Sequence, residues 1–180
     1  GFVPTGIDIS DYLIAKLGSI FKKECLDINL FQKDISNSID IENSFEVVYC
    51  LDTLEHIENL HDAIKNIKKI LQPGGFLIAT LPWREILDNN MVVCPKCNHC
   101  FHRVGHFHSF HSHNEISQTL GNNFTIITFG FITPIYSFKD RLVSLIKKSL
   151  LKRKFYKDGL PIFQTTCFII AELNPGVKYP

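Results

Sequence analysis

Residues 94–113 concentrate side chains that bind metal ions, because they hold six of the chain's eight histidines and three of its six cysteines. Cys94 and Cys97 form a Cys-x-x-Cys turn, in which two thiolates can face one ion. His102 and His106 lie four residues apart and can supply two further ligands. A set of two cysteines and two histidines fits zinc best.

The same segment offers spare ligands, which are His99, Cys100, His108, His111 and His113. Cys94, Cys97 and Cys100 could instead begin an iron–sulfur site, but such a cluster usually needs a fourth cysteine, and the other cysteines lie in distant segments. A second alternative is a group of surface residues that binds no metal. Four protein ligands would leave no open position on the ion, so a zinc site here would be structural. Metal binding would then fix the shape of a small insertion, residues 91–113, that has few apolar side chains.

Asp8 and Asp34 are a second set of candidate functional residues, since each follows a short apolar segment that is predicted to be a strand. Ligands of open parallel sheets bind at the carboxyl ends of the strands, where an acid can accept hydrogen bonds from the hydroxyl groups of a ribose. The alternative is that both acids stabilise their own loops or are solvated.

Strands and helices alternate in the first half of the chain. FVPTGID, INLFQKD, FEVVYC and FLIATLP are predicted strands, and FEVVYC is apolar enough for a strand that is covered on both faces. Ser10 is placed to cap a helix whose apolar residues share one face. Leu60, Ile64, Ile67 and Leu71 recur at helical spacing, and QPGG is expected to stop that helix. This order predicts a parallel α/β sheet.

Further elements follow the histidine-rich segment. We expect a short helix near residues 114–120 that is closed by Gly121, then a strand at FTIITFGFI and a final strand at IFQTTCFIIAEL. Between these two strands, a basic amphipathic helix around residues 141–157 could contact a phosphate-bearing acceptor or the surface of a membrane. The alternative is an ordinary solvated helix face.

The motifs GIDIS, QKDI, FEVVYCLDTLEHI and LQPGGFLIATLP together resemble the class I S-adenosylmethionine (SAM)-dependent methyltransferases. The resemblance covers almost the whole chain and implies a doubly wound, Rossmann-like α/β sheet. It implies that Asp8, with Ile9, holds the ribose of SAM, and that Asp34 faces the adenine amino group beside the backbone of Ile35. Leu51 and Asp52 match positions that line the methionine end of the cofactor pocket.

Some members of this family carry a similar insertion, with CPxC followed by FHxxGH and a phenylalanine. In this sequence those residues are Cys94, Cys97, His102, His106 and Phe110. The resemblance therefore favours these cysteines and histidines as the zinc ligands over the spare ones.

The chain departs from the family at one point. The family's first strand and its Gly-rich loop come about 20 residues before the ribose-binding acid, whereas seven residues precede Asp8 here. We therefore expect residues 1–180 to be part of a longer, N-terminally truncated methyltransferase domain that lacks the first strand. Glycines let the backbone approach the cofactor closely, so we expect this chain by itself to bind SAM weakly.

The segment DTLEH resembles the metal site of certain O-methyltransferases, in which Asp52, Glu55 and His56 would bind a divalent ion that holds the acceptor hydroxyl. The alternative is that Asp52 caps the next helix and that Glu55, three residues later, completes a capping box. His56 is the candidate general base beside the acceptor.

Composition sets limits on partners and location. A formal net charge of +1 gives no strong signal for nucleic-acid binding, and the scattered cysteines fit a reducing, cytoplasmic setting. The sequence predicts a SAM-dependent methyltransferase that acts on a small-molecule, sugar or lipid-linked acceptor. The alternative is a non-catalytic, degenerate methyltransferase fold that serves as a zinc-containing binding module.

Overall fold

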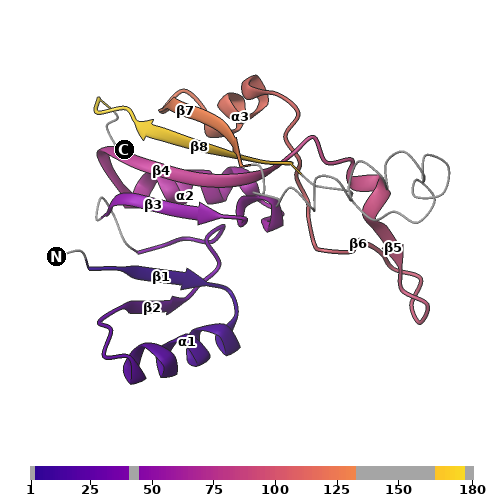
Figure 1. Cartoon of the computed structure of the whole chain (residues 1–180), viewed down its shortest axis with the longest axis horizontal. Coiled ribbons are helices and arrows are strands. Elements are labelled where there is room, and N and C mark those ends of the chain that lie inside the picture. The colour runs from indigo at the N-terminus through magenta and orange to yellow at the C-terminus, as the bar shows by residue number, and fades with distance from the viewer. Residues whose placement is uncertain (1–2, 41–44, 133–164, 177–180) are drawn as a thin grey trace, which may run out of the picture.

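The structure is a computed structural model that describes residues 3–40, 45–132 and 165–176. It contains a two-stranded sheet, β1–β2, a four-stranded sheet in the order β3–β4–β8–β7, and a small ribbon, β5–β6. The two larger sheets lie one beside the other, and the ribbon projects beyond the end of the four-stranded sheet (Figure 1). Among the described residues, no helix is both long enough and apolar enough to cross a membrane.

The N-terminal unit is β1 (Thr5–Asp8), α1 (Asp11–Lys23) and β2 (Asn29–Gln32), with the two strands parallel. The predicted cap is confirmed, because the Ser10 side chain accepts a hydrogen bond from the Leu13 N–H at 3.2 Å. Asp11 in the first turn and two lysines in the last turn complement the helix dipole. Asp8 therefore ends β1 as expected, and Asp34 follows β2 by two residues.

The second unit begins with β3 (Phe45–Leu51) and a short 3-10 helix, η1 (Leu54–His56), followed by α2 (Leu60–Ile70) and β4 (Leu71–Trp83). β3 and β4 are parallel. Asn59 caps α2 by accepting a hydrogen bond from the Asp62 N–H. The apolar stripe of α2 is buried as its spacing predicted.

The remaining elements are η2 (Leu87–Asn90), β5 (Met91–Val93), β6 (Cys100–His102), α3 (His113–Leu120), β7 (Phe124–Ile132) and β8 (Thr165–Leu173). β8 runs antiparallel to both of its neighbours, β4 and β7, so the sheet is mixed. The parallel pairing predicted from the first half of the chain is confirmed for β1–β2 and for β3–β4, and the antiparallel pairs come with β8. Gly121 ends α3 with a φ of 73°, as predicted for a helix-closing glycine.

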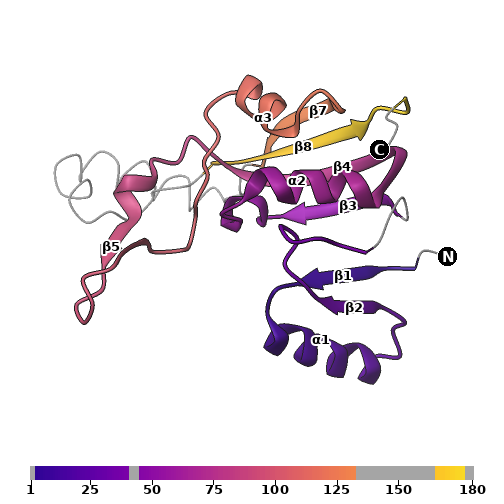
Figure 2. The same cartoon turned by 180° about the vertical axis from the view of Figure 1, so that it is seen from behind.

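The hydrophobic core lies between the four-stranded sheet and the helices α2 and α3, which pack against each other and cover one face (Figures 1 and 2). Leu77, Ile169, Ala171 and Leu173 are fully buried in it. By contrast, no residue of α1 is buried. The four-stranded sheet with α2 and α3 is therefore the well-packed part of the molecule, and it positions the site residues of β3, β4 and η1.

A gap separates the two sheets. β1 and β3 run side by side in the same direction in both views, but no strand pairing joins them (Figures 1 and 2). β3 is thus an edge strand, and Tyr49 and Leu51 are 66% and 55% exposed. The expectation that β3 is covered on both faces is wrong for this reason.

Two other expectations need correction or lie outside the described residues. Leu71 begins β4 instead of ending the preceding helix, and QPGG forms part of β4. The helix therefore stops at Ile70, before the glycines. The proposed basic helix, residues 141–157, lies outside the described residues.

Candidate functional site: a cavity between the sheets and a histidine cluster beside it

The gap between the sheets is a cavity of about 1240 Å³. Of the residues predicted to bind the cofactor, five line it, which are Asp8, Ile9, Asp34, Ile35 and Asp52. Leu51 is not among its lining residues, although it is exposed. His56 lines the same cavity, so the candidate general base and the candidate cofactor residues share one space. The structure thus brings together residues that are up to 48 positions apart, from Asp8 to His56.

Asp8 and Asp34 are held by their own loops. Asp8 Oδ1 accepts a hydrogen bond from the Ser10 N–H at 2.8 Å, and no described residue donates to its Oδ2. Asp34 Oδ1 accepts from both the N–H and the hydroxyl of Ser36, at 2.8 and 2.6 Å. These bonds fix each carboxylate at the rim of the cavity. Asp8 Oδ2 keeps its acceptor capacity for a ligand.

The loop after Asp34 is anchored to α2. The Asn66 side-chain amide donates to the carbonyl oxygens of Ile35 and Asn37, at 2.8 and 2.6 Å. Lys69 of the same helix donates to the Ile39 carbonyl at 3.4 Å, so two side chains of α2 hold the segment that carries Asp34 against the helix. The position of Asp34 relative to β3 therefore depends on this anchor.

Asp52 adopts a left-handed backbone conformation that Thr80 of β4 stabilises. Its φ is 47°, a region that residues other than glycine seldom adopt, although aspartate and asparagine do so more often than the rest. The Asp52 N–H donates to Thr80 Oγ1 at 2.7 Å, and the same hydroxyl donates to Asp52 Oδ1 at 2.8 Å. The expected capping box is therefore wrong, because the Asp52 carboxylate binds Thr80 and η1 begins after Thr53 without a side-chain cap.

The two cysteines form the turn that their spacing predicts. The Asn98 N–H donates to the Cys94 carbonyl at 2.9 Å, and Asn98 closes the turn with a left-handed φ of 55°, which asparagine tolerates. However, in the part of the chain that the structure describes, neither Cys94 nor Cys97 belongs to a group of three or more possible ligands that lie within 4.8 Å of one another. The zinc site of Cys94, Cys97, His102 and His106 therefore stays a prediction.

The two predicted histidine ligands instead lie against Glu85. The side chains of Glu85, His102 and His106 are 5%, 4% and 9% exposed. His106 Nδ1 lies 2.5 Å from Glu85 Oε2, and His102 Nε2 lies 3.5 Å from Glu85 Oε1. The His102 ring accepts a hydrogen bond from the His106 N–H through its Nδ1, at 3.0 Å. Burial lowers the pKa of His102, which favours its neutral form.

The histidine-rich insertion docks on η1 by backbone hydrogen bonds. The Glu55 carbonyl accepts from the N–H groups of Phe107 and His108, at 2.7 and 3.4 Å. His108 Nε2 in turn lies 2.9 Å from the Ile57 carbonyl. These contacts place His106 beside Glu55 and His56, and one ligand atom from each of these three lies within 4.8 Å of the others. Burial raises the pKa of the Glu55 carboxyl.

Sequence reasoning missed Glu85. Glu85 follows Trp83 and Arg84 in a segment that contains no recognisable ligand motif, so nothing in its neighbourhood marks it as a functional residue. Trp83 packs on Phe129 and Phe131 of β7, with ring centroids 5.3 Å away in both cases. The signal that could have found Glu85 is a lone acid immediately after a buried strand, next to an insertion rich in histidine.

Residues 3–79 match the family described as Methyltransferase domain. A ubiquinone biosynthesis O-methyltransferase of Coxiella burnetii is 31% identical over 77 residues, which cover 43% of this chain and 33% of that protein. An S-adenosylmethionine-dependent methyltransferase of Mesorhizobium loti aligns in structure with a TM-score of 0.63 at 13% identity, over 94% of this chain and 80% of that one. The chain has a Rossmann-like methyltransferase fold.

The methyltransferase fold does not by itself fix the reaction. The cyclase SpnF shares it with a TM-score of 0.67 at 14% identity, over 97% of this chain and 67% of that one. In sequence, the chain spans about a third of the length of the curated relatives it matches. The matched residues 3–79 include Asp8, Asp34, Asp52 and His56, but they exclude the insertion with His106.

Cys94 is expected to be the most reactive thiol of this methyltransferase fold at neutral pH. Hydrogen bonds from the backbone N–H groups of Lys96 and Cys97 lower its pKa, whereas burial raises the pKa of Cys50 to about 12 and that of Cys167 to about 11. A lower pKa means more thiolate, which is the form that reacts. Iodoacetamide in the presence of a chelator should therefore modify Cys94 first, as followed by mass spectrometry of its peptides.

The buried cysteines Cys50 and Cys167 provide the internal control for this experiment. Both should stay unmodified in the folded protein and react after unfolding in urea. Modification of Cys50 at the rate of Cys94 in native buffer would contradict the structure.

Proposed function

We propose that this chain forms the SAM-binding part of a SAM-dependent methyltransferase that acts on a small-molecule, sugar or lipid-linked acceptor. One observation carries the proposal: Asp8, Asp34 and Asp52 meet in one cavity beside the carboxyl ends of β1, β2 and β3. Ligands of open α/β sheets bind at this end of the strands. The match of residues 3–79 to the methyltransferase domain supports it.

The residues present fit a nucleoside. Asp8 Oδ2 accepts no hydrogen bond from the described residues and can accept one from a ribose hydroxyl. Ile9, Ile35 and Val48 give the cavity apolar surface for a flat base or a thioether chain. SAM, when bound, would supply the methyl group. The protein would align the acceptor with that group and exclude water.

His56 is the candidate general base in this proposal. It lines the cavity and is exposed, so it can reach an acceptor. Its Nδ1 donates to the Gly105 carbonyl at 3.1 Å, which fixes the ring and leaves Nε2 to take a proton.

The gap between β1 and β3 supports a further part of the proposal. No described strand pairs with β1 or β3 on the side that faces the gap, and such edges normally pair or are covered. We infer that the complete protein places another strand between them, and that this strand completes the cavity floor. Binding of SAM by the 180-residue chain would then be weak.

Exchange of Asp8 for asparagine tests the proposal. Saturation-transfer NMR detects weak ligands, and it should show SAM bound to the unmodified chain with affinity reduced about tenfold or more in Asp8→Asn, since a hydrogen bond to a charged group contributes about 1.5–3 kcal/mol. Asp40→Asn is the matched control, because Asp40 is exposed and is not among the lining residues of the cavity. Equal SAM signals from both variants, or no signal from the unmodified chain, would favour the non-catalytic binding module.

A further inference from the structure

We propose that a second, smaller cavity binds a neutral sugar ring and is the acceptor subsite of the proposed methyltransferase. This insertion pocket has a volume of about 390 Å³ and is lined by residues 85–88 and by four residues of the segment 107–111. Phe107 lines both the insertion pocket and the cavity between the sheets, so a ligand that packs on its ring can extend from one into the other.

The chain around Phe107 is anchored to the loop that carries η1. The Phe107 N–H donates to the Glu55 carbonyl at 2.7 Å, and His108 Nε2 lies 2.9 Å from the Ile57 carbonyl, to which it donates because a carbonyl can only accept. Phe107 is nevertheless 51% exposed. Its backbone is therefore held in place while its ring remains available to a ligand.

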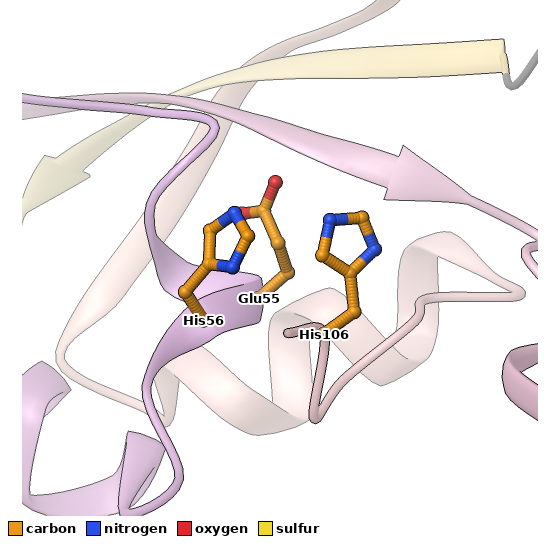
Figure 3. Close-up of side chains that lie close together, drawn as sticks. All are labelled: Glu55, His56 and His106. Carbon is orange, nitrogen blue, oxygen red and sulfur yellow. The ribbon is translucent and has the colours of Figure 1, made fainter. Parts of the chain in front are cut away.

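His56 lies on the other side of this junction. Figure 3 shows its ring beside that of His106, the residue before Phe107, and the two ring centroids are 4.8 Å apart. His56 Nδ1 lies 3.1 Å from the carbonyl of Gly105, which also belongs to the insertion. Because His56 and Phe107 both line the cavity between the sheets, a ring on Phe107 can present a hydroxyl group to the candidate general base.

The lining of the insertion pocket suits a ligand with many hydroxyl groups. Five of its eight lining residues are polar or charged, whereas pockets for small apolar ligands are lined mainly by apolar side chains. Asp88 and His111 are exposed, so their side chains can bond to a ligand. A carboxylate accepts hydrogen bonds from hydroxyl groups, and a neutral imidazole donates one bond and accepts another.

The apolar part of the lining consists of Ile86, Leu87 and Phe107. Ile86 is 60% exposed, so it too presents apolar surface to a ligand. A sugar ring combines an apolar face of C–H groups with hydroxyl groups around its edge. The apolar side chains can therefore pack on the face of the ring while Asp88 and His111 bind its hydroxyl groups.

The charges of the insertion pocket disfavour a phosphate- or carboxylate-bearing ligand. Its described lining includes the acids Glu85 and Asp88 but no lysine or arginine. An anion placed beside these carboxylates would be repelled, whereas a neutral sugar would not. The volume of the pocket lies near the lower end of the range of about 300–1,000 Å³ for ligand pockets. It therefore suits a single ring better than a long lipid chain.

This inference names the acceptor class of the proposed function. Residues 85–88 and 107–111 lie outside residues 3–79, so the insertion pocket is not part of the matched methyltransferase domain. Its role in methyl transfer rests on the proposed function. Binding of a sugar does not, because it requires neither SAM nor catalysis and can be measured without them.

Saturation-transfer NMR in the absence of SAM tests the pocket with four free monosaccharides: glucose, galactose, rhamnose and N-acetylglucosamine. At least one of them should bind to the unmodified chain. Asp88→Ala should weaken that binding by about tenfold or more, because it removes a hydrogen bond to a charged group. Asp27→Ala is the matched control, since Asp27 is exposed and lines neither cavity. Circular dichroism would show that both variants fold.

Two further measurements separate the alternatives. An excess of inorganic phosphate should leave the sugar bound, whereas displacement would indicate a site for an anion. Asp8→Asn should leave sugar binding unchanged, because Asp8 lines only the cavity between the sheets. Binding of none of the four sugars, displacement by phosphate, equal binding by Asp88→Ala and Asp27→Ala, or loss of the sugar in Asp8→Asn would each overturn the proposal. Failure of SAM to bind would contradict the proposed function and leave these results unaffected.

Discussion

Replacing Leu77 with alanine is expected to lower the free energy of unfolding by about 2–5 kcal/mol. Leu77 lies in β4 between Val48 of β3 and Ala171 of β8, and its side chain is 0% exposed. The substitution removes buried methyl groups and leaves a cavity that the strands on both sides cannot close. Urea denaturation followed by circular dichroism measures the change.

Leu26→Ala is the matched control for this prediction. The same atoms are removed, but Leu26 is 53% exposed in the loop between α1 and β2, so the loss should stay within about 0.5 kcal/mol. Equal losses in the two variants would show that the four-stranded sheet is not the core of the molecule.

Local signals explain which elements could be predicted from the sequence. Ser10 and Gly121 mark a helix start and a helix end through hydrogen bonding and backbone conformation within a few residues. The helical spacing of Ile64 and Ile67 predicts α2, and this signal too lies within a few residues of sequence. The placement of β8 between β4 and β7 has no local signal, because it depends on pairing with strands that lie far away in the sequence.

In the candidate site, too, some residues could be predicted from local signals, whereas others are brought together only by long-range contacts. Asp8 and Asp34 could be predicted because each lies at or just past the carboxyl end of a strand, and parallel strands of one sheet end at the same edge. The histidines were recognised as ligands by type, but their spacing pointed to Cys94 and Cys97 as partners. The folded insertion turns His106 toward Glu55 through the hydrogen bond between Phe107 and the Glu55 carbonyl, a long-range contact that spacing does not reveal.

The exposed face of β3 could not be predicted from its composition either. FEVVYC is apolar on both faces, yet Tyr49 is 66% exposed because β3 stands at the edge of the gap. Apolar side chains on an edge strand fit a strand that is covered in the complete protein. The disagreement between the composition of β3 and its exposure therefore supports the proposal that another strand belongs between β1 and β3.

Replacing Gly75 with alanine is expected to destabilise the protein by about 1–3 kcal/mol, because backbone atoms on both sides would clash with the new methyl group. A Cβ at Gly75 would lie 2.9 Å from the Gln72 carbonyl oxygen and 3.0 Å from the Glu46 carbonyl oxygen. Neither oxygen can rotate away as a side chain can, so β4 would have to separate from β3 where Leu71 pairs with Phe45.

The control is a second glycine, Gly18, at which alanine is expected to raise the free energy of unfolding instead of lowering it. A Cβ at Gly18, in the middle of α1, would meet Leu30 at 3.8 Å, which is ordinary contact. Gly18→Ala should therefore stabilise the protein by about 0.5–1 kcal/mol, because alanine restricts the unfolded chain and favours helix. Urea denaturation of both variants measures the two changes in the free energy of unfolding, which should be opposite in sign. A stable Gly75→Ala variant would mean that β3 moves freely at its start, and the wall of the cavity that β3 forms would then not be fixed before a ligand binds.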